Sequence, residues 1–203
     1  MTSGNSALRL PLALLLAALP LSSALAHTGV GVAGGLTSGF MHPMLGPDHI
    51  IAMVAVGLWG AQLGAPAIWV LPITFPLVMA FGGLLGVMNV PLPFIEQGVA
   101  VSGIALGLFV FMNVRLPLAI AACIVGVFAI FHGYAHGREL PEAADPVAYA
   151  VGFVVATGLL HLVGILIGEL IKWPAGAKLV RGCGAAIGCA GVYFLLAAVG
   201  VVE

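Results

Sequence analysis

The stretch Met41-His-Pro-Met-Leu-Gly-Pro-Asp-His-Ile50 (MHPMLGPDHI) interrupts a chain that is otherwise largely hydrocarbon. Within eight consecutive residues of this stretch, two histidines and an aspartate are separated by two prolines and a glycine. Proline removes a backbone donor and breaks or kinks a helix interior. Broken backbone at membrane depth is tolerated only where it is packed in protein or lines a cavity. The stretch therefore predicts a broken helix whose polar side chains face the protein interior.

The composition of the chain indicates a membrane protein. Of its 203 residues, 62% are hydrophobic and only 6% are charged, whereas a soluble domain carries about 25% charged residues. The net charge of -1 argues against a nucleic-acid partner. Because the apolar segments follow one another with short gaps, we expect an all-α integral membrane protein with a single transmembrane helical domain over residues 27–203. With no CxxC spacing, the cysteines indicate buried small hydrophobes and not a disulfide or zinc site: Cys123, Cys183 and Cys189.

The N-terminus has the features of a secretory signal peptide. Arg9 supplies the positive charge, residues 10–21 the apolar core, and Ala24-Leu25-Ala26 the small residues of a cleavage site. We expect cleavage after residue 26, so that residues 1–26 are the signal peptide and His27 begins the mature chain outside the cytoplasm. The alternative is an uncleaved first helix, which leaves the downstream topology unchanged.

Five later segments are long enough to cross a membrane, which takes about 20 apolar residues: residues 67–88, 94–113, 116–133, 147–170 and 179–202. The segment 28–64 is too long for one straight crossing and short for two, at about 1.5 Å per residue, and Pro43, Gly46 and Pro47 split it. Asp48 stands where an N-cap would begin a new helix. We expect six crossings with a Pro/Gly-broken first element, or seven if this segment crosses twice.

The positively charged residues distinguish these two counts. With six crossings and the mature N-terminus outside, four basic residues fall on the cytoplasmic side: Arg115, Lys172, Lys178 and Arg181. Arg138 falls outside, in a loop rich in acidic residues. Seven crossings would reverse this distribution. Because cytoplasmic loops carry the excess of Lys and Arg, the positive-inside rule favours six.

The ionisable residues gather at one depth of this map. Most lie between the outer surface and mid-membrane, together with His27 at the mature N-terminus: His42, Asp48, His49, Glu96, His132, His136 and Glu139. An ionisable group within a membrane is costly unless paired, and is a functional candidate by default. Imidazole suits nickel, copper, zinc and cobalt ions, and carboxylate compensates their charge. Residues four apart share a helix face, as His132 and His136 do, so we expect a divalent-metal site.

Each of these residues also has a structural interpretation. Asp48 can cap a helix, Glu96 can complement a helix dipole, and the histidines can anchor helix ends or bond to carbonyls. Any one of these structural roles is plausible by itself. It is less plausible that all of them together place the ionisable residues at one depth. His161, alone in the middle of a span, is expected to be a satisfied structural histidine, and Glu169 a solvated helix terminus.

Two stretches of the chain match sequence motifs of a known family. HPMLGPDH, residues 42–49, is a His-x5-Asp-His motif, and FHGYAHGRE, residues 131–139, is a second motif. Together with the signal peptide that ends before His27, they carry a resemblance that covers essentially the whole chain. The chain resembles the HupE/UreJ family of nickel permeases, small membrane proteins associated with hydrogenase and urease maturation.

The resemblance implies a function and a set of metal-binding residues. It implies uptake of nickel, with cobalt as an alternative, across the bacterial inner membrane by an energy-independent or secondary route. The mature N-terminus would be periplasmic, and the metal ion would be cargo and not a resident cofactor. The bilayer and the ion are the implied partners, with an oligomer left open. The residues implied are His42, Asp48 and His49 in the first motif, His132, His136 and Glu139 in the second, and Glu96 as a further acidic position.

Two other functions are compatible with such a metal site. One is an intramembrane zinc-dependent hydrolase, in which zinc held by histidines and Asp48 activates water, although the sequence has no HExxH or Gly-x-Ser-x-Gly motif. The other is a metal sensor or accessory subunit. The sequence also has no Gly-x4-Gly-Lys motif for ATP hydrolysis. We therefore expect a permease and not an enzyme, with the amine and imidazole of His27 as the first ligands that the ion meets.

Overall fold

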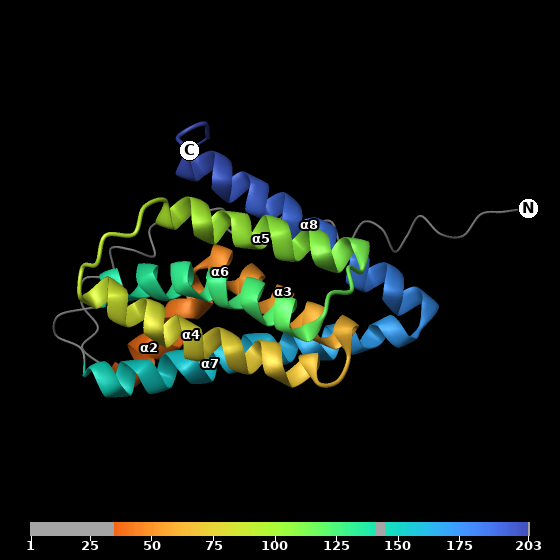
Figure 1. Cartoon of the computed structure of the whole chain (residues 1–203), viewed down its shortest axis with the longest axis horizontal. Helices are drawn as coiled ribbons and strands as arrows, with labels where there is room; N and C mark the ends of the chain where they lie inside the picture. Colours follow the sequence, from red (N-terminus) through yellow and green to blue (C-terminus); the bar gives the residue numbers. More distant parts are fainter. Residues whose placement is uncertain (1–34, 141–144, 203) are drawn as a thin grey trace, which may run out of the picture.

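The computed structural model describes residues 35–140 and 145–202, and this part of the chain consists of helices and the loops between them (Figure 1). The helices are α2 (Gly35–Leu45), α3 (Pro47–Leu63), α4 (Ala67–Val87), α5 (Ile95–Met112), α6 (Leu118–Arg138), α7 (Pro146–Gly168), the 3-10 turn η2 (Glu169–Lys172) and α8 (Pro174–Ala198). The signal peptide over residues 1–26, and His27, lie outside the described residues and stay predictions.

Five helices could span a membrane, and a bent pair of helices would bring the number to the expected six if it counts as one span. The helices α4, α5, α6, α7 and α8 are each long and apolar enough to cross, with η2 extending α7. The helices α2 and α3 meet the same criterion only as a pair, which bends by 81° at the break between them. The pair is the expected Pro/Gly-broken first element, with the geometry of a broken span or of a re-entrant loop. The alternative of seven crossings involves residues 28–34, which lie outside the described residues.

The helix bounds differ from those expected most at the end of α6 and the start of α8, and the start of α3 differs as well. The helix α6 continues to Arg138, beyond the predicted end at residue 133, and therefore contains both histidines of the second motif. The helix α8 begins at Pro174 and not at 179, because proline at the first helical position sacrifices no hydrogen bond. Asp48 is not the N-cap of α3. Gly46 is the cap and Pro47 the first helical residue, so Asp48 lies within the first turn.

The prediction of buried cysteines is wrong. Cys123 and Cys189 are exposed, and Cys183 is partly exposed. All three belong to helices that are apolar enough to cross a membrane. On such helices both the packed face and the lipid-facing face are apolar, so hydrophobic character alone cannot distinguish them.

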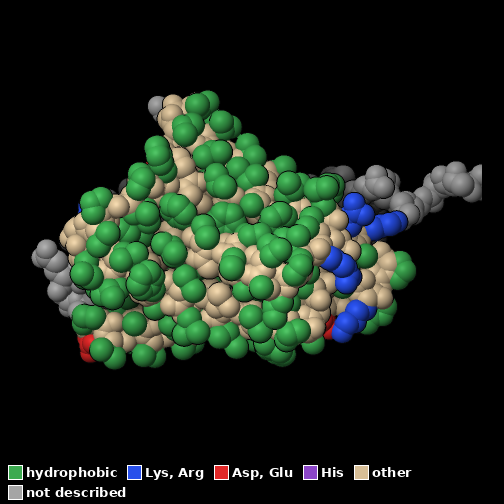
Figure 2. All heavy atoms as spheres, in the orientation of Figure 1, with side chains coloured by type: hydrophobic (Ala, Val, Ile, Leu, Met, Phe, Trp, Pro, Cys, Tyr) green, Lys and Arg blue, Asp and Glu red, His purple; other side chains and the backbone are tan. Residues whose placement is uncertain are grey.

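The helix α3 lies at the centre of the bundle. The helices α2 and α3 pack against the first and second parts of α7, while α4 packs against α6 and α5 against α8. Most of α3 is buried, including Met53 and Trp59. The surrounding helices expose large apolar side chains such as Leu77 and Phe81, and Figure 2 shows that most of the side chains along the face in view are apolar. The bundle therefore presents hydrocarbon to lipid and encloses α3.

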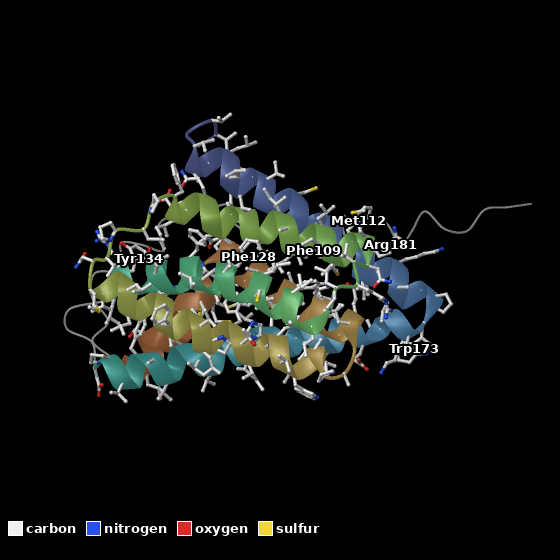
Figure 3. The ribbon with its side chains drawn as sticks, viewed as in Figure 1. Phe109, Met112, Phe128, Tyr134, Trp173 and Arg181 are labelled. Atoms are coloured by element: carbon white, nitrogen blue, oxygen red, sulfur yellow. The ribbon has the colours of Figure 1, made fainter. Side chains whose placement is uncertain are left out.

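Basic residues gather at one end of the bundle, hereafter the basic end (Figure 2). It comprises the α3–α4 loop, the α5–α6 loop and the α7–α8 junction, and Figure 3 labels Trp173 and Arg181 there, with Tyr134 toward the opposite end. Arg138 lies at that opposite end, where it hydrogen-bonds to Asn89. The asymmetry is the one expected from the sequence. The basic residues of these segments and of the first part of α8 are Arg115, Lys172, Lys178 and Arg181.

Candidate metal centre

The two sequence motifs meet at the end of the bundle opposite the basic end. His42 lies in the last turn of α2, His49 in the first turn of α3, and His136 in the last turn of α6. The ring centroid of His136 is 4.7 Å from that of His42 and 4.3 Å from that of His49. Because the 81° bend separates α2 from α3, His42 and His49 reach His136 from two different helices.

His42, His136 and Glu139, hereafter the outer group, are placed to hold a metal ion. Each offers one ligand atom, and these atoms all lie within 4.8 Å of one another. Donors on one transition-metal ion lie about 3 Å apart, given bonds of about 2.0–2.2 Å, so a small contraction would bring all three donors onto one ion. His42 Nε2 and Glu139 Oε2 are 3.3 Å apart and their side chains are 20% and 26% exposed, whereas His136 is buried.

The Asp48 carboxylate fixes the imidazole of His49. Asp48 Oδ1 lies 2.8 Å from His49 Nδ1, and it accepts from the His49 backbone N–H at 2.9 Å. When Nδ1 donates its proton to this carboxylate, the lone pair of the neutral imidazole is on Nε2. That atom is buried and has no hydrogen-bond partner among the described residues. Carboxylates commonly orient metal-binding histidines in this way, so Asp48 adds charge to the centre through His49.

Ser102 fixes His132 in a similar way from α5. Its Oγ donates to Val99 O at 2.6 Å and lies 2.8 Å from His132 Nε2. Because the hydroxyl proton is used by Val99, the oxygen accepts from Nε2–H, which leaves the lone pair of a neutral His132 on Nδ1. This Nδ1 is buried and has no partner in residues 35–140 and 145–202. His132 is not in the outer group, but its ring centroid is 4.9 Å from that of His49.

Gly46, at the break between α2 and α3, provides the space for Asp48 and His49. A Cβ at this position would lie 2.9 Å from His49 Nδ1 and 3.2 Å from Asp48 Oδ1. The backbone of Gly46 is extended, with φ -91 and ψ 101, which is open to other residues. The side-chain contact, and not the backbone conformation, therefore favours glycine here.

Aromatic rings of α7 form one wall of the centre. The ring of His42 lies 6.0 Å from that of Tyr149, and the ring of His136 lies 4.4 Å from that of Phe153. An apolar shell of this kind limits solvent access and strengthens the interaction between an ion and its ligands.

The remaining candidates lie apart from the outer group. Glu96 is exposed in the first turn of α5, and Glu169 pairs with Lys172 at a partly exposed helix end. His161 is 1% exposed, but neither of its ring nitrogens has a hydrogen-bond partner in the described part of the chain. The expectation of a satisfied structural histidine is therefore wrong as to its hydrogen bonding.

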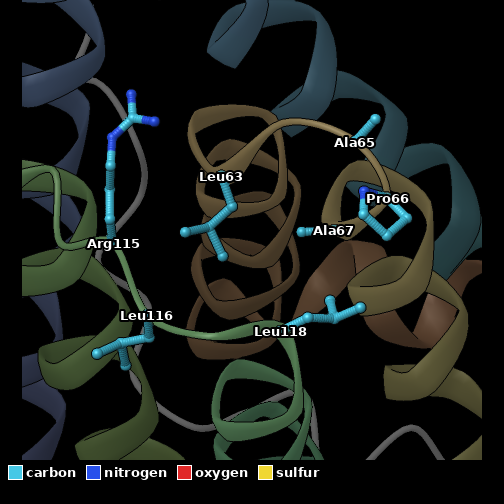
Figure 4. A pocket seen from close by; sticks show the side chains of 7 residues that line it. All are labelled: Leu63, Ala65, Pro66, Ala67, Arg115, Leu116 and Leu118. Carbon is cyan, nitrogen blue, oxygen red and sulfur yellow. The ribbon is translucent and has the colours of Figure 1, made fainter.

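A separate cavity of about 230 Å³ lies at the basic end (Figure 4). It is formed between the α3–α4 loop and the α5–α6 loop. Its lining includes the cationic side chain of Arg115 and no carboxylate or imidazole, so it does not suit a metal ion. The lining residues are Leu63, Ala65, Pro66, Ala67, Arg115, Leu116 and Leu118.

Sequence reasoning missed Ser102. It is 30 residues from His132 along the chain, and no motif spacing relates two residues on different helices. The available signal was polarity, because a hydroxyl inside an apolar span tends to find a partner on a neighbouring helix.

Similar proteins identify the family of the chain. Residues 13–194 match the family model for the HupE / UreJ protein. Protein HupE of Rhizobium leguminosarum bv. viciae is 44% identical over 182 residues, which are 89% of this chain and 95% of that protein. No solved structure matches. With the family model spanning most of its length, and both motifs of the metal centre within that match, this membrane protein belongs to the HupE/UreJ family.

Proposed function

We propose that this protein is a nickel permease of the bacterial inner membrane, with cobalt as a second cargo, which supplies metal to nickel enzymes. The observation that carries the proposal is the outer group, whose ligand atoms lie within 4.8 Å of one another. Nitrogen and carboxylate donors suit such ions. Membership of the HupE/UreJ family supports the choice of cargo.

The basic end would face the cytoplasm, in keeping with the positive-inside rule. The outer group would then face the periplasm, on the same side as the mature N-terminus left by cleavage after residue 26. His27 would meet the ion first, with its free amine and imidazole. Glu96, exposed at the start of α5, would attract cations to this face by its charge.

The ion would move inward by exchange of one donor for the next. It first binds the outer group and loses water stepwise. The lone pairs on His49 Nε2 and His132 Nδ1, both buried and without partners among the described residues, are the next donors. Asp48 and Glu139 offset the charge of the ion in this low-dielectric region. Without a nucleotide-binding motif, the route is facilitated diffusion or secondary transport.

Uptake of radioactive nickel by liposomes that contain the purified chain tests this function. His42→Ala and Glu139→Gln should reduce the initial rate to that of protein-free liposomes, because each removes a donor of the outer group. Glu169→Gln makes the same chemical change at the basic end and should keep the wild-type rate. A His42→Ala variant that loads nickel like the wild-type chain would show that the first motif is not the site.

The same liposomes separate the permease from the alternatives. A zinc hydrolase with this donor set would hold its metal permanently and consume a lipid or amide substrate, without loading the vesicles. A sensor or accessory subunit would bind nickel and likewise leave the lumen empty. Time-dependent accumulation of nickel inside the vesicles, with no substrate consumed, is the result expected.

A further inference from the structure

A second set of polar side chains is buried on α7, away from the outer group. His161 and Thr157 are 1% and 0% exposed. Neither the two ring nitrogens of His161 nor the hydroxyl of Thr157 has a hydrogen-bond partner among the described residues. Residues four apart lie on one face of a helix, so both groups point to the same side of α7. Buried polar groups without partners destabilise a fold and require an explanation.

His161 and Thr157 lie deeper in the bundle than the outer group. The carbonyl of His161 packs against Gly57 of α3. Gly57 follows His49 by eight residues, which is about 12 Å along a helix toward the basic end. The pair therefore lies on the inner side of the imidazoles that the permease mechanism uses.

One aromatic side chain joins the two regions. The ring centroid of Phe75, on α4, lies 5.4 Å from that of His132 and 5.5 Å from that of His161. Phe75 is fully buried. Phe75 therefore contacts both the imidazole of His132, at the metal centre, and the imidazole of His161.

We propose that His161 and Thr157 form an inner binding site, which receives the divalent metal ion from His132 and releases it toward the basic end. The inference rests on the permease function proposed above and extends it with a site that neither sequence motif contains. It accounts for two buried polar groups that have no partner in the described part of the chain.

The donors of this inner site suit release. It offers an imidazole and a hydroxyl, which are both neutral ligands. The acidic residues of the described part of the chain lie elsewhere, in or beside the outer group or at helix ends: Asp48, Glu96, Glu139, Asp145 and Glu169. Conduction requires that an ion bind well enough to enter and weakly enough to leave. A site without a carboxylate meets the second condition better than the outer group does.

The experiment compares nickel uptake into liposomes with equilibrium nickel binding to the purified chain. His161→Leu replaces an imidazole without partners by an apolar side chain, so its melting temperature should equal or exceed that of the wild-type chain. Nickel binding at the outer group should stay within about twofold of wild type, while uptake falls at least about tenfold, as expected for loss of a ligand. Thr157→Val keeps the shape and removes the hydroxyl, and should lower uptake about threefold, since hydroxyls are weaker ligands.

A neighbouring core residue supplies the matched control. Leu160→Met changes a buried side chain next to His161 while conserving its volume and polarity, a swap that cores tolerate. It should leave binding and uptake unchanged. His161→Gln, which keeps a polar group, is the second variant should the leucine variant fail to fold, and it should show the same loss of uptake with intact binding.

The possible failures are distinguishable. Wild-type uptake in His161→Leu or His161→Gln overturns the inner site and leaves the permease function intact. Joint loss of nickel binding and uptake in whichever of the two variants fold assigns His161 a structural role and also overturns the site. If the wild-type chain itself loads no nickel, the proposed function fails, and this result is independent of the variants.

Discussion

The helix pair α5–α8 and the metal centre bring helices together by different means. Between α5 and α8 the backbones touch, since a Cβ on Gly184 would lie 2.8 Å from Gly107 O and 2.9 Å from the Cβ of Val110. At the metal centre, side chains fill the space between helices, with successive ring centroids 4.3 to 4.9 Å apart. The rings there belong to His42, His136, His49 and His132.

The contact between α5 and α8 contributes to the stability of the fold, whereas the metal centre contributes to metal binding. Helix association in lipid depends on van der Waals contact between small residues, because lipid provides no hydrophobic drive. The metal centre instead keeps two buried nitrogen atoms, His49 Nε2 and His132 Nδ1, without partners among the described residues, which destabilises the fold. It therefore depends on the glycine-packed pairs for its support. Substitutions in the two regions should have opposite signatures.

The largest effect is expected at the metal centre itself. His136→Ala removes the imidazole that contacts both His42 and His49, and nickel uptake should fall about 100-fold or more, since even indirect partners of a metal cost up to that much. Its melting temperature should change little. Uptake in liposomes and thermal unfolding in detergent check this. A variant that loses both nickel uptake and thermal stability would contradict the proposal that His136 serves metal binding and not the stability of the fold.

The reverse signature is expected from Gly184→Ala on α8. The added methyl group meets the backbone of α5, and overpacking costs about 1–3 kcal/mol, so the melting temperature should fall while uptake per folded molecule is retained. Gly182→Ala is the matched control two residues away, where nothing lies within 4 Å of an added Cβ. It should be neutral or stabilising by up to about 1 kcal/mol, the difference in helix propensity. Equal stability of the two variants would contradict the backbone contact.

A smaller effect is expected from Ser102→Ala, because Ser102 belongs to α5 but serves the metal centre. The substitution removes the acceptor of His132 Nε2–H, so the imidazole loses its orientation, and uptake should fall about tenfold. Nickel titration of the purified chain should show a weaker site as well. Unchanged uptake and affinity would mean that the hydroxyl contributes only to packing.

The smallest effect is expected from Glu96→Gln. Glu96 is exposed in the first turn of α5 and would act by charge at a distance, so uptake should fall about twofold at low ionic strength and recover in high salt. Initial rates measured across a salt series check this, with Glu169→Gln as the control at the basic end. A loss that persists in high salt would instead make Glu96 a direct ligand.

Most of the span map could be predicted from sequence. The five later spans, the broken first element and the position of Arg115 and Lys172 at one end follow from apolar segment length and from charge. The end of α6 could not be predicted, because the run of apolar residues stops at residue 133 while the helix continues through polar residues to Arg138. The exposure of Cys123 also escaped, since lipid and protein interior favour the same side chains.

The sequence indicated which histidines belong to the metal centre, but it did not indicate the hydrogen bonds that they make. The depth at which His42, His49 and His136 fall indicated that they meet, and their rings are adjacent. The pairing of Asp48 with its own neighbour could not be read from spacing, because adjacent residues on a helix do not share a face. The unsatisfied nitrogens of His161 were equally hidden, since hydrogen bonding depends on the residues of other helices.

The break between α2 and α3 at Gly46 restricts the number of residues in the first motif. A single residue separates α2 from α3, so an inserted residue there would lengthen the connection by up to about 3.6 Å and change how the two helices are placed against each other. His42 would then lose its contact with His136, even though every original residue of the motif is still present. The surface loop that connects α4 to α5 carries no such restriction. Among related sequences, the count of residues between the two histidines should therefore report metal binding more faithfully than the identity of those residues.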